Sequence, residues 1–259
     1  MQENFDFSGE ASSQSESSAS ANASAQSANS YGSDHQRPIE SDQPLESSSH
    51  FWVAADNYFN STLVLTPSGA GEHKHQIKVY DATGQMVNKL ELTFAAGQPG
   101  VFDLNAALGD CKVVAGLMQA HVEVVSWFPT QHRCFLTVAD RQALVSPAIE
   151  INKKKAGFFP LQISNQSKNI LTFCNKSMPD SHVRCRLYTG TRAPEIEIKV
   201  PAYGAAMVNI EQEFEEYLNL SSSRQTQAYL RIVSSSSAEL AATLIEKKYP
   251  RSINLEEME

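Results

Sequence analysis

A repeat of about 108 residues runs through this chain and constrains its fold more than any single residue does. The positions that recur are mostly apolar or small, and no triplet of polar residues recurs with them. The matched pairs are Leu63 and Leu171, Leu65 and Phe173, Tyr80 and Tyr188, Val122 and Leu230, Val124 and Ile232, Ser126 and Ser234, and Leu136 and Leu244. Packing preserves buried positions, so the repeat predicts a duplicated domain whose copies share a core and not a chemistry.

Short apolar–polar alternations separated by polar turns predict half-buried antiparallel strands in both copies. The first copy has seven of them, at 51–55, 62–66, 76–80, 87–94, 101–104, 120–127 and 133–138. The second copy also has seven, at 159–163, 169–173, 183–188, 195–200, 206–210, 227–233 and 240–246. We therefore expect an all-β chain made of two tandem antiparallel immunoglobulin-like β-sandwiches.

Two smaller features agree with this duplication. The segment Glu211–Leu220 has apolar residues spaced by three and four and predicts a short helix, with Asn105–Gly109 as its counterpart in the first copy. Gly84 and Gly190 each follow a predicted strand and mark the tip of a hairpin.

The segments outside the two copies are polar. Residues 1–50 contain 15 serines and eight acids against Arg37 alone, so they carry a charge of −7 out of the formal −8 and lack the apolar surface needed to fold. The expected organisation is a disordered acidic Ser-rich tail at 1–50, β-sandwich 1 at 51–148, a linker at 149–156 that contains Lys153–Lys155, β-sandwich 2 at 157–248 and an acidic C-terminal tail at 249–259.

Charge and composition exclude several classes of function. The folded part is nearly neutral and has no basic stripe, which argues against nucleic-acid binding. The chain shows neither a secretory signal nor an apolar run long enough for membrane insertion, so we expect a cytoplasmic protein. The four cysteines, Cys111, Cys134, Cys174 and Cys185, form no zinc-ligand pattern and are expected to be reduced and mostly buried, although Cys174 and Cys185 are predicted to lie on neighbouring strands.

The sequence offers little catalytic chemistry. No nucleophile elbow, phosphate-binding loop or metalloprotease helix is present, so we expect no enzymatic activity and no cofactor. His73 and His75 are weak metal candidates, because they lie at i and i+2 but lack a recognisable third ligand; the alternative is an exposed polar loop beside Gly69 and Gly71. His121 and His132, which flank the turn at Trp127, are expected to be hydrogen-bonded histidines at the surface.

Four aromatic residues of the first copy are the candidates for ligand or partner contact: Trp52, Tyr58, Trp127 and Phe128. One interpretation is core packing, since sandwich cores commonly bury a tryptophan. The other is an exposed binding platform. Trp127 and Phe128 favour the second interpretation, because the other copy has serines at the equivalent turn.

The opening of the first copy has Trp52, then Ala55 three residues later, an acid, a small polar residue and Tyr58. The later segments Gln76–Tyr80, Leu90–Ala96, Phe102–Asn105 and Val122–Ser126 follow in order. Over residues 51–128 the chain resembles the bacterial sensory rhodopsin transducer family, whose members are small soluble β-sandwich proteins. The resemblance implies a sandwich fold and assembly into oligomers; the second copy lacks the tryptophan motif.

The function expected from these observations is that of a bacterial, non-enzymatic scaffold or adaptor that binds protein partners through its tandem sandwiches, for example by strand addition at a sheet edge, and that forms a homo-oligomer. The alternative is a small-ligand or carbohydrate-binding module that uses exposed aromatic residues such as Trp127.

Overall fold

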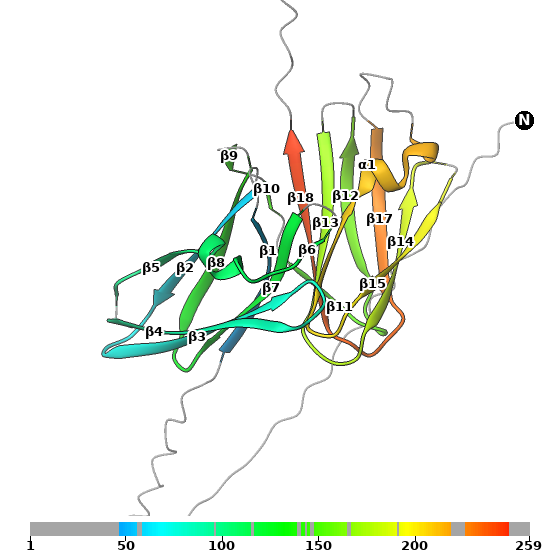
Figure 1. The fold of residues 1–259 in the computed structure, drawn as a ribbon. Coiled ribbons are helices and arrows are strands. Elements are labelled where there is room, and N and C mark those ends of the chain that lie inside the picture. The colour runs from blue at the N-terminus through cyan, green and yellow to red at the C-terminus, as the bar shows by residue number, and fades with distance from the viewer. Residues whose placement is uncertain are drawn as a thin grey trace, which may run out of the picture. The chain divides into compact units, whose positions relative to one another are not determined.

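The computed structural model describes residues 47–55, 59–95, 97–114, 117–138, 141–142, 144–145, 148–164, 167–190, 192–218 and 226–248. These residues lie in one compact unit, Gln43–Glu259. They form an all-β fold in which every paired strand is antiparallel, as the alternation of apolar and polar residues predicts (Figure 1). No helix among the described residues is long and apolar enough to span a membrane.

The first sandwich has two sheets. One runs in the order β1 (Ser47–Ala55), β7 (Leu117–Ser126), β3 (Glu72–Asp81) and β4 (Met86–Ala95), with β6 (Val113–Val114) also paired to β7. The other runs in the order β5 (Gly100–Asp103), β2 (Phe59–Pro67), β8 (Thr130–Val138) and β9 (Arg141–Gln142). Alternate residues of these strands, together with the short 3-10 helix η1 (Asn105–Leu108), form a buried apolar core between the sheets.

The second sandwich repeats this arrangement. One sheet runs in the order β12 (Gly157–Ile163), β17 (Thr226–Ser234), β14 (Ser181–Tyr188) and β15 (Glu195–Val200). The other runs in the order β10 (Leu144–Val145), β18 (Leu240–Lys248), β13 (Ser167–Asn175) and β16 (Ala205–Asn209), with β11 (Ile149–Ile151) also paired to β18. A second apolar core fills the space between them, and α1 (Ile210–Glu213) and the 3-10 helix η2 (Glu215–Tyr217) follow β16.

The strand pairing shows how closely the two copies correspond. Phe51 pairs with Val122 and Phe159 pairs with Leu230, so the shift of 108 residues is kept between these strands. In the other sheet Leu63 pairs with Cys134, whereas Leu171 pairs with Leu244, so the register there differs by two residues. A slip of two residues keeps every side chain on its own face, which is why the core pattern survives.

All fourteen predicted strands are present, and the all-β prediction is confirmed. The strand order nevertheless differs from that of an immunoglobulin constant domain, in which the first and second strands share a sheet and the sixth and seventh share the other. Here the first strand pairs with the sixth main strand, and the second pairs with the last (β1 with β7, β2 with β8). The term immunoglobulin-like therefore applies to the two-sheet architecture and not to the connectivity.

Several sequence predictions are corrected by the structure. Ser47–His50, predicted as the end of the tail, are the first residues of β1, because they pair with Glu123–Ser126 of β7. Leu144–Val145, in predicted sandwich 1, and Ile149–Ile151, in the predicted linker, form β10 and β11, and both pair with β18 of the second sandwich. The predicted helix at Glu211–Leu220 is divided into α1 and η2. The tails at 1–46 and 249–259 lie outside the described residues.

Cys174 and Cys185 do not lie on neighbouring strands. Cys174 is on β13 and Cys185 is on β14, and these strands belong to different sheets of the second sandwich. Each side chain is buried in a different apolar cluster, and both thiols are free. Burial raises the pKa of the Cys185 thiol to about 12.

A third buried cluster joins the two sandwiches. It contains Trp52 and Ala54 of β1, Leu117 of β7 and Leu136 of β8, together with residues of the second sandwich: Ile170, Cys174, Ala205, Ala241 and Ile245. The contact therefore joins the outer face of β1 and β7, together with Leu136 of β8, to the outer face of the β18–β13–β16 sheet. These two faces are not equivalent in the repeat, so the copies pack through unlike surfaces.

Backbone also meets backbone at this contact. The Ala205 N–H donates to the carbonyl oxygen of Ala82 at 3.3 Å. Gly84 adopts φ +88° in the turn that the Asp81 carboxylate stabilises, and a Cβ at Gly84 would overlap the carbonyl oxygen of Ala202. Glycine at this position is therefore required by its conformation and by the close approach of the second sandwich.

We predict that Gly84→Ala lowers the free energy of unfolding by about 1–3 kcal/mol more than Gly97→Ala does, because overpacking adds to the backbone strain. Gly97 is the matched control, since it has φ +74° and open space where a Cβ would lie. Urea unfolding followed by circular dichroism measures both variants. Equal destabilisation by the two substitutions would contradict the close contact at Gly84.

Candidate functional site

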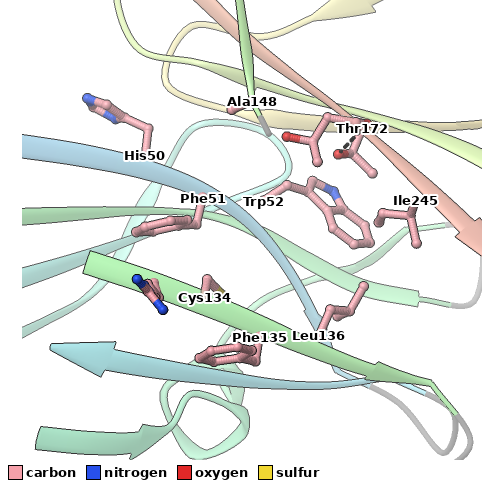
Figure 2. A pocket seen from close by; sticks show the side chains of 11 residues that line it. His50, Phe51, Trp52, Cys134, Phe135, Leu136, Ala148, Thr172 and Ile245 are labelled. Atoms are coloured by element: carbon pink, nitrogen blue, oxygen red, sulfur yellow. Dashed lines mark hydrogen bonds between the residues drawn. The ribbon is translucent and has the colours of Figure 1, made fainter. Parts of the chain in front are cut away.

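A groove of about 660 Å³ lies where the two sandwiches meet. Its walls come from β1, β8, β13 and β18, and most of its lining is apolar (Figure 2). The lining residues are His50, Phe51, Trp52, Arg133, Cys134, Phe135, Leu136, Ala148, Thr172, Thr243 and Ile245. A cavity of this size and character falls in the range typical of ligand-binding pockets.

Strand β1 contributes to the groove because it is apolar on both faces. Phe51 and Val53 pack against the core of the first sandwich, whereas Trp52 and Ala54 belong to the cluster between the sandwiches. A strand with apolar residues at every position is typical of a sheet that is covered on both sides. Strands β13 and β18 are also apolar on both faces, one in the core of the second sandwich and the other in the cluster between the sandwiches. This signal is visible in the sequence, and it could have predicted that the sandwiches pack face to face.

Trp52 is fixed in the wall of the groove. Its side chain is 9% exposed, and its Nε1–H donates to Gln119 Oε1 at 3.0 Å. The Phe59 ring lies edge-on to the indole, with ring centroids 6.1 Å apart. Because the polar end of the indole is satisfied, Trp52 presents only apolar surface to the groove.

Phe135 on β8 is the most exposed aromatic residue of the groove, at 39%. Arg133, on the same strand, and Thr243, on β18, add polar groups to the lining. Thr172 lies across the groove, on the second sandwich (Figure 2). An apolar groove with a few polar groups can hold apolar side chains while fixing their orientation.

Two strand edges border the groove. Strand β1 pairs only with β7, and β8 pairs with β2 on one side and, at Thr137–Val138 alone, with β9 on the other. Along the rest of these two edges, the described residues include no further strand partner. At the β1 edge, the Ser61 hydroxyl group already bonds the N–H and C=O of Ala54, so an added strand would pair with other backbone groups of these edges.

The other predicted contact residues do not lie in this groove. Trp127 is half-buried and Phe128 is 39% exposed, in the turn between β7 and β8. The Phe128 ring contacts the His73 ring edge-on, with ring centroids 4.8 Å apart. Tyr58 lies outside the described residues. The structure therefore separates Trp52 from the Trp127–Phe128 pair.

The prediction that His73 and His75 lie in an exposed loop is wrong. Both are on β3 and are almost fully buried, because the alternation of this strand turns them toward the interior. Among the described residues no group of three His, Cys, Asp or Glu side chains is arranged to hold a metal ion. Their burial was not predicted, because Gly69 and Gly71 indicate a loop. That loop ends at Gly71, one residue before β3 begins.

A hydrogen-bonded chain connects His75 to β1. His75 Nδ1 lies 2.7 Å from Ser126 Oγ, which lies 2.6 Å from His132 Nε2, and His132 Nδ1 lies 2.9 Å from Ser49 Oγ. Ser126 has no exposed surface. A serine that no substrate can reach does not act as a nucleophile, so the serine–histidine pair is a structural element.

His121 is also buried, contrary to the expectation of a surface position. It hydrogen-bonds to the Tyr203 carbonyl oxygen of the second sandwich and to His50, each at 2.9 Å. Its ring stacks on Tyr80, which in turn stacks on Tyr203. Desolvation by burial lowers the pKa of His50 to about 4 and also lowers the pKa of His121, so both are neutral at pH 7.

Comparisons with known proteins give no family for this chain. No protein-family model and no curated protein matches it. Among solved structures it is similar to the STIV MCP, at 10% identity over 78% of this chain and 92% of that chain with a TM-score of 0.25. It is also similar to tripeptidyl peptidase 2, at 9% identity over 80% of this chain and 19% of that chain with a TM-score of 0.29.

A third similar structure is that of the infectious bursal disease virus Gx strain, at 9% identity over 75% of this chain and 57% of that chain with a TM-score of 0.24. At these TM-scores none of the three likenesses bears on the function of this chain.

We predict that the folded chain loses stability as the pH falls from 7.5 to 5.5, and that His75 accounts for about 1.4 kcal/mol of this loss. Burial, with His132 and His73 nearby, lowers the pKa of His75 from 6.5 to about 4. Below pH 6.5 the unfolded chain therefore binds a proton that the folded chain does not bind. The stabilisation is complete above pH 6.5 and declines as the pH falls toward 4.

Urea unfolding at pH 7.5, 6.5 and 5.5 measures this effect. His75→Gln, which cannot titrate, should show a smaller loss between pH 7.5 and 5.5 than the wild type. Gln76→Asn, on the same strand, is the control, because it removes no titratable group and should keep the wild-type pH dependence. An unchanged pH dependence in His75→Gln would show that this buried imidazole does not couple folding to pH.

Proposed function

We propose that this protein is a non-enzymatic adaptor whose groove between the sandwiches binds an extended, apolar segment of a protein partner. The observation that carries the proposal is the coincidence of an apolar groove with the open edges of β1 and β8. A partner segment that pairs with one of these edges directs alternate side chains to one side, as in other cases of strand addition.

The lining of the groove supports apolar anchor residues in the partner. Trp52, Leu136 and Ile245 are largely buried and held in place by the contact between the sandwiches, so their arrangement exists before a ligand arrives. A preformed apolar site lowers the entropic cost of binding. Arg133 at the wall favours a segment with an acidic residue close to its apolar anchors.

Among the described residues, one histidine and one cysteine line the groove. Burial lowers the pKa of His50 to about 4 and raises the pKa of Cys134 to about 12, so neither is tuned to act as a base or a nucleophile at pH 7. We therefore propose binding without chemistry. A cytoplasmic location, assembly into a homo-oligomer and membership of the sensory rhodopsin transducer family stay predictions from the sequence.

The test compares two surfaces of equal exposure. We expect Phe135→Asp, in the groove, to weaken binding of the partner at least tenfold, because a carboxylate would be placed in an apolar wall. Phe128→Asp is the matched control: Phe128 has the same 39% exposure and lies outside the groove. Affinity purification from the native host with wild type and both variants, followed by mass spectrometry and calorimetry on the purified partner, measures the difference.

Selective loss of a stoichiometric partner in Phe135→Asp would support the groove as the binding site. Selective loss in Phe128→Asp would move the site to the turn between β7 and β8. A partner held equally by all three proteins would contradict both locations.

A small amphipathic ligand or a carbohydrate is the second candidate, and the groove volume of about 660 Å³ favours it specifically. The chain has two tryptophans, so Trp127→Phe leaves Trp52 as the only one and makes indole fluorescence a reporter of the groove. We expect a shift of this emission on titration with a glycan panel if the second candidate is correct. Unchanged emission across the panel would leave the protein partner as the only proposal for the groove.

A further inference from the structure

The outer face of the β12–β17–β14–β15 sheet carries three arginines in one cluster. Arg184 and Arg186 lie two residues apart on β14, so they share a face, and Arg186 is directly opposite Arg231 on β17. Together with Glu195 and Val233 they line a cavity of about 70 Å³. This surface belongs to the second sandwich alone and does not include any residue of the groove.

The charges in the cluster are not balanced. The Glu195 carboxylate lies 2.7 Å from Arg186 Nη2 and 3.9 Å from Arg184 Nη1, so one carboxylate forms ion pairs with both arginines. Among the described residues no carboxylate lies within ion-pair distance of Arg231, although this side chain is half-buried. The three arginines and Glu195 therefore have a net charge of +2, while Glu197, directly opposite Arg184 on β15, hydrogen-bonds to His182 at 2.8 Å.

The duplicated sandwich shows that this arrangement is not required by the fold. At the equivalent positions of the first sandwich, Lys78 is directly opposite Glu123, and their Nζ and Oε2 atoms form an ion pair at 3.1 Å. The second copy has Arg186 and Arg231 there. Like charges directly opposite each other on a sheet are destabilising. The replacement of an ion pair by two arginines therefore calls for an explanation outside folding.

We propose that this arginine cluster binds a phosphoryl group carried by a phosphorylated protein segment. A phosphoryl monoester has a charge of about −1.5 to −2 at pH 7, which matches the net charge of the cluster. Guanidinium groups bind phosphate oxygens through paired, charge-assisted hydrogen bonds. The cavity of about 70 Å³ exceeds the roughly 10–15 Å³ that a single water molecule needs, so it has room for a compact group such as a phosphoryl.

The surroundings of the cluster favour a protein segment over a small phosphate ester. The cavity is set in an open sheet face, and two aromatic side chains flank it, each 59% exposed: Phe158 on β12 is opposite Arg231, and Tyr229 precedes Arg231 by two residues on β17. Exposed aromatic residues beside a phosphate site provide contacts for the residues on either side of a phosphorylated side chain. A free phosphate ester would leave both of these surfaces unused.

The test uses the full-length chain and a fluorescein-labelled pentapeptide with phosphoserine at its centre and phenylalanine on both sides of it. We expect the phosphorylated peptide to bind at least tenfold more tightly than its unphosphorylated form, with an affinity that falls as salt is added. Arg231→Gln should weaken binding at least tenfold. Lys89→Gln, which removes one positive charge from an exposed site on the first sandwich, should leave binding unchanged.

Nuclear magnetic resonance locates the site independently of affinity. The Nε–H signals of Arg184, Arg186 and Arg231 should shift in a saturable way during the titration. Equal affinity for the two peptides, no binding at 1 mM peptide, or wild-type affinity in Arg231→Gln would overturn the proposal. Phenyl phosphate that binds as tightly as the phosphorylated peptide would overturn the assignment to a protein segment.

Discussion

The apolar contact between the two sandwiches is the interaction on which the rest of this structure depends. Trp52 and Ala54 on one side and Ile170 and Ile245 on the other remove from water the second face of two sheets that already cover a core on their first face. Burial of apolar surface is the main favourable contribution to the free energy of such a contact. The same contact builds the groove, because its wall contains side chains from both sandwiches.

The two copies have diverged where they face different surroundings. Position 52 is tryptophan in the contact between the sandwiches, and its equivalent, Pro160, lies on the exposed face of the second sandwich. His121 is buried against Tyr203, whereas its equivalent, Tyr229, is exposed. One strand arrangement thus supports a packed contact in the first copy and a charged, open face in the second. Among the described residues, the outer face of the β12–β17–β14–β15 sheet contributes none to the cluster between the sandwiches.

Much of the fold could be predicted from sequence because its signals are local. The alternation in Glu195–Val200 places Ile196 and Ile198 on the inner face, as observed, and the glycine at position 84 marks a turn with positive φ. The burial of His73 and His75 was not predictable in the same way. His73 and His75 share the buried face of β3 with Ile77 and Val79, but the predicted strand began at Gln76 and so placed both histidines in the preceding loop.

The groove and the arginine cluster depend on contacts between residues far apart in the chain. Trp52 could be identified as a notable aromatic residue, but not as a neighbour of Ile245, because the sequence does not state which faces of the two sandwiches meet. The pairing of Arg186 with Arg231 likewise requires the strand order, in which β14 lies beside β17. Apolar residues at consecutive positions of β1, β13 and β18 were the available signal for sheets covered on both sides.

The most direct measurement of the contact between the sandwiches is a nuclear Overhauser experiment on full-length protein with labelled isoleucine methyl groups. The structure predicts cross-peaks between the Trp52 indole and the methyl group of Ile245, which lies on the other sandwich. Cross-peaks from the indole to residues of the first sandwich alone would contradict the face-to-face contact. In that case the groove, and the function proposed for it, would have no structural basis.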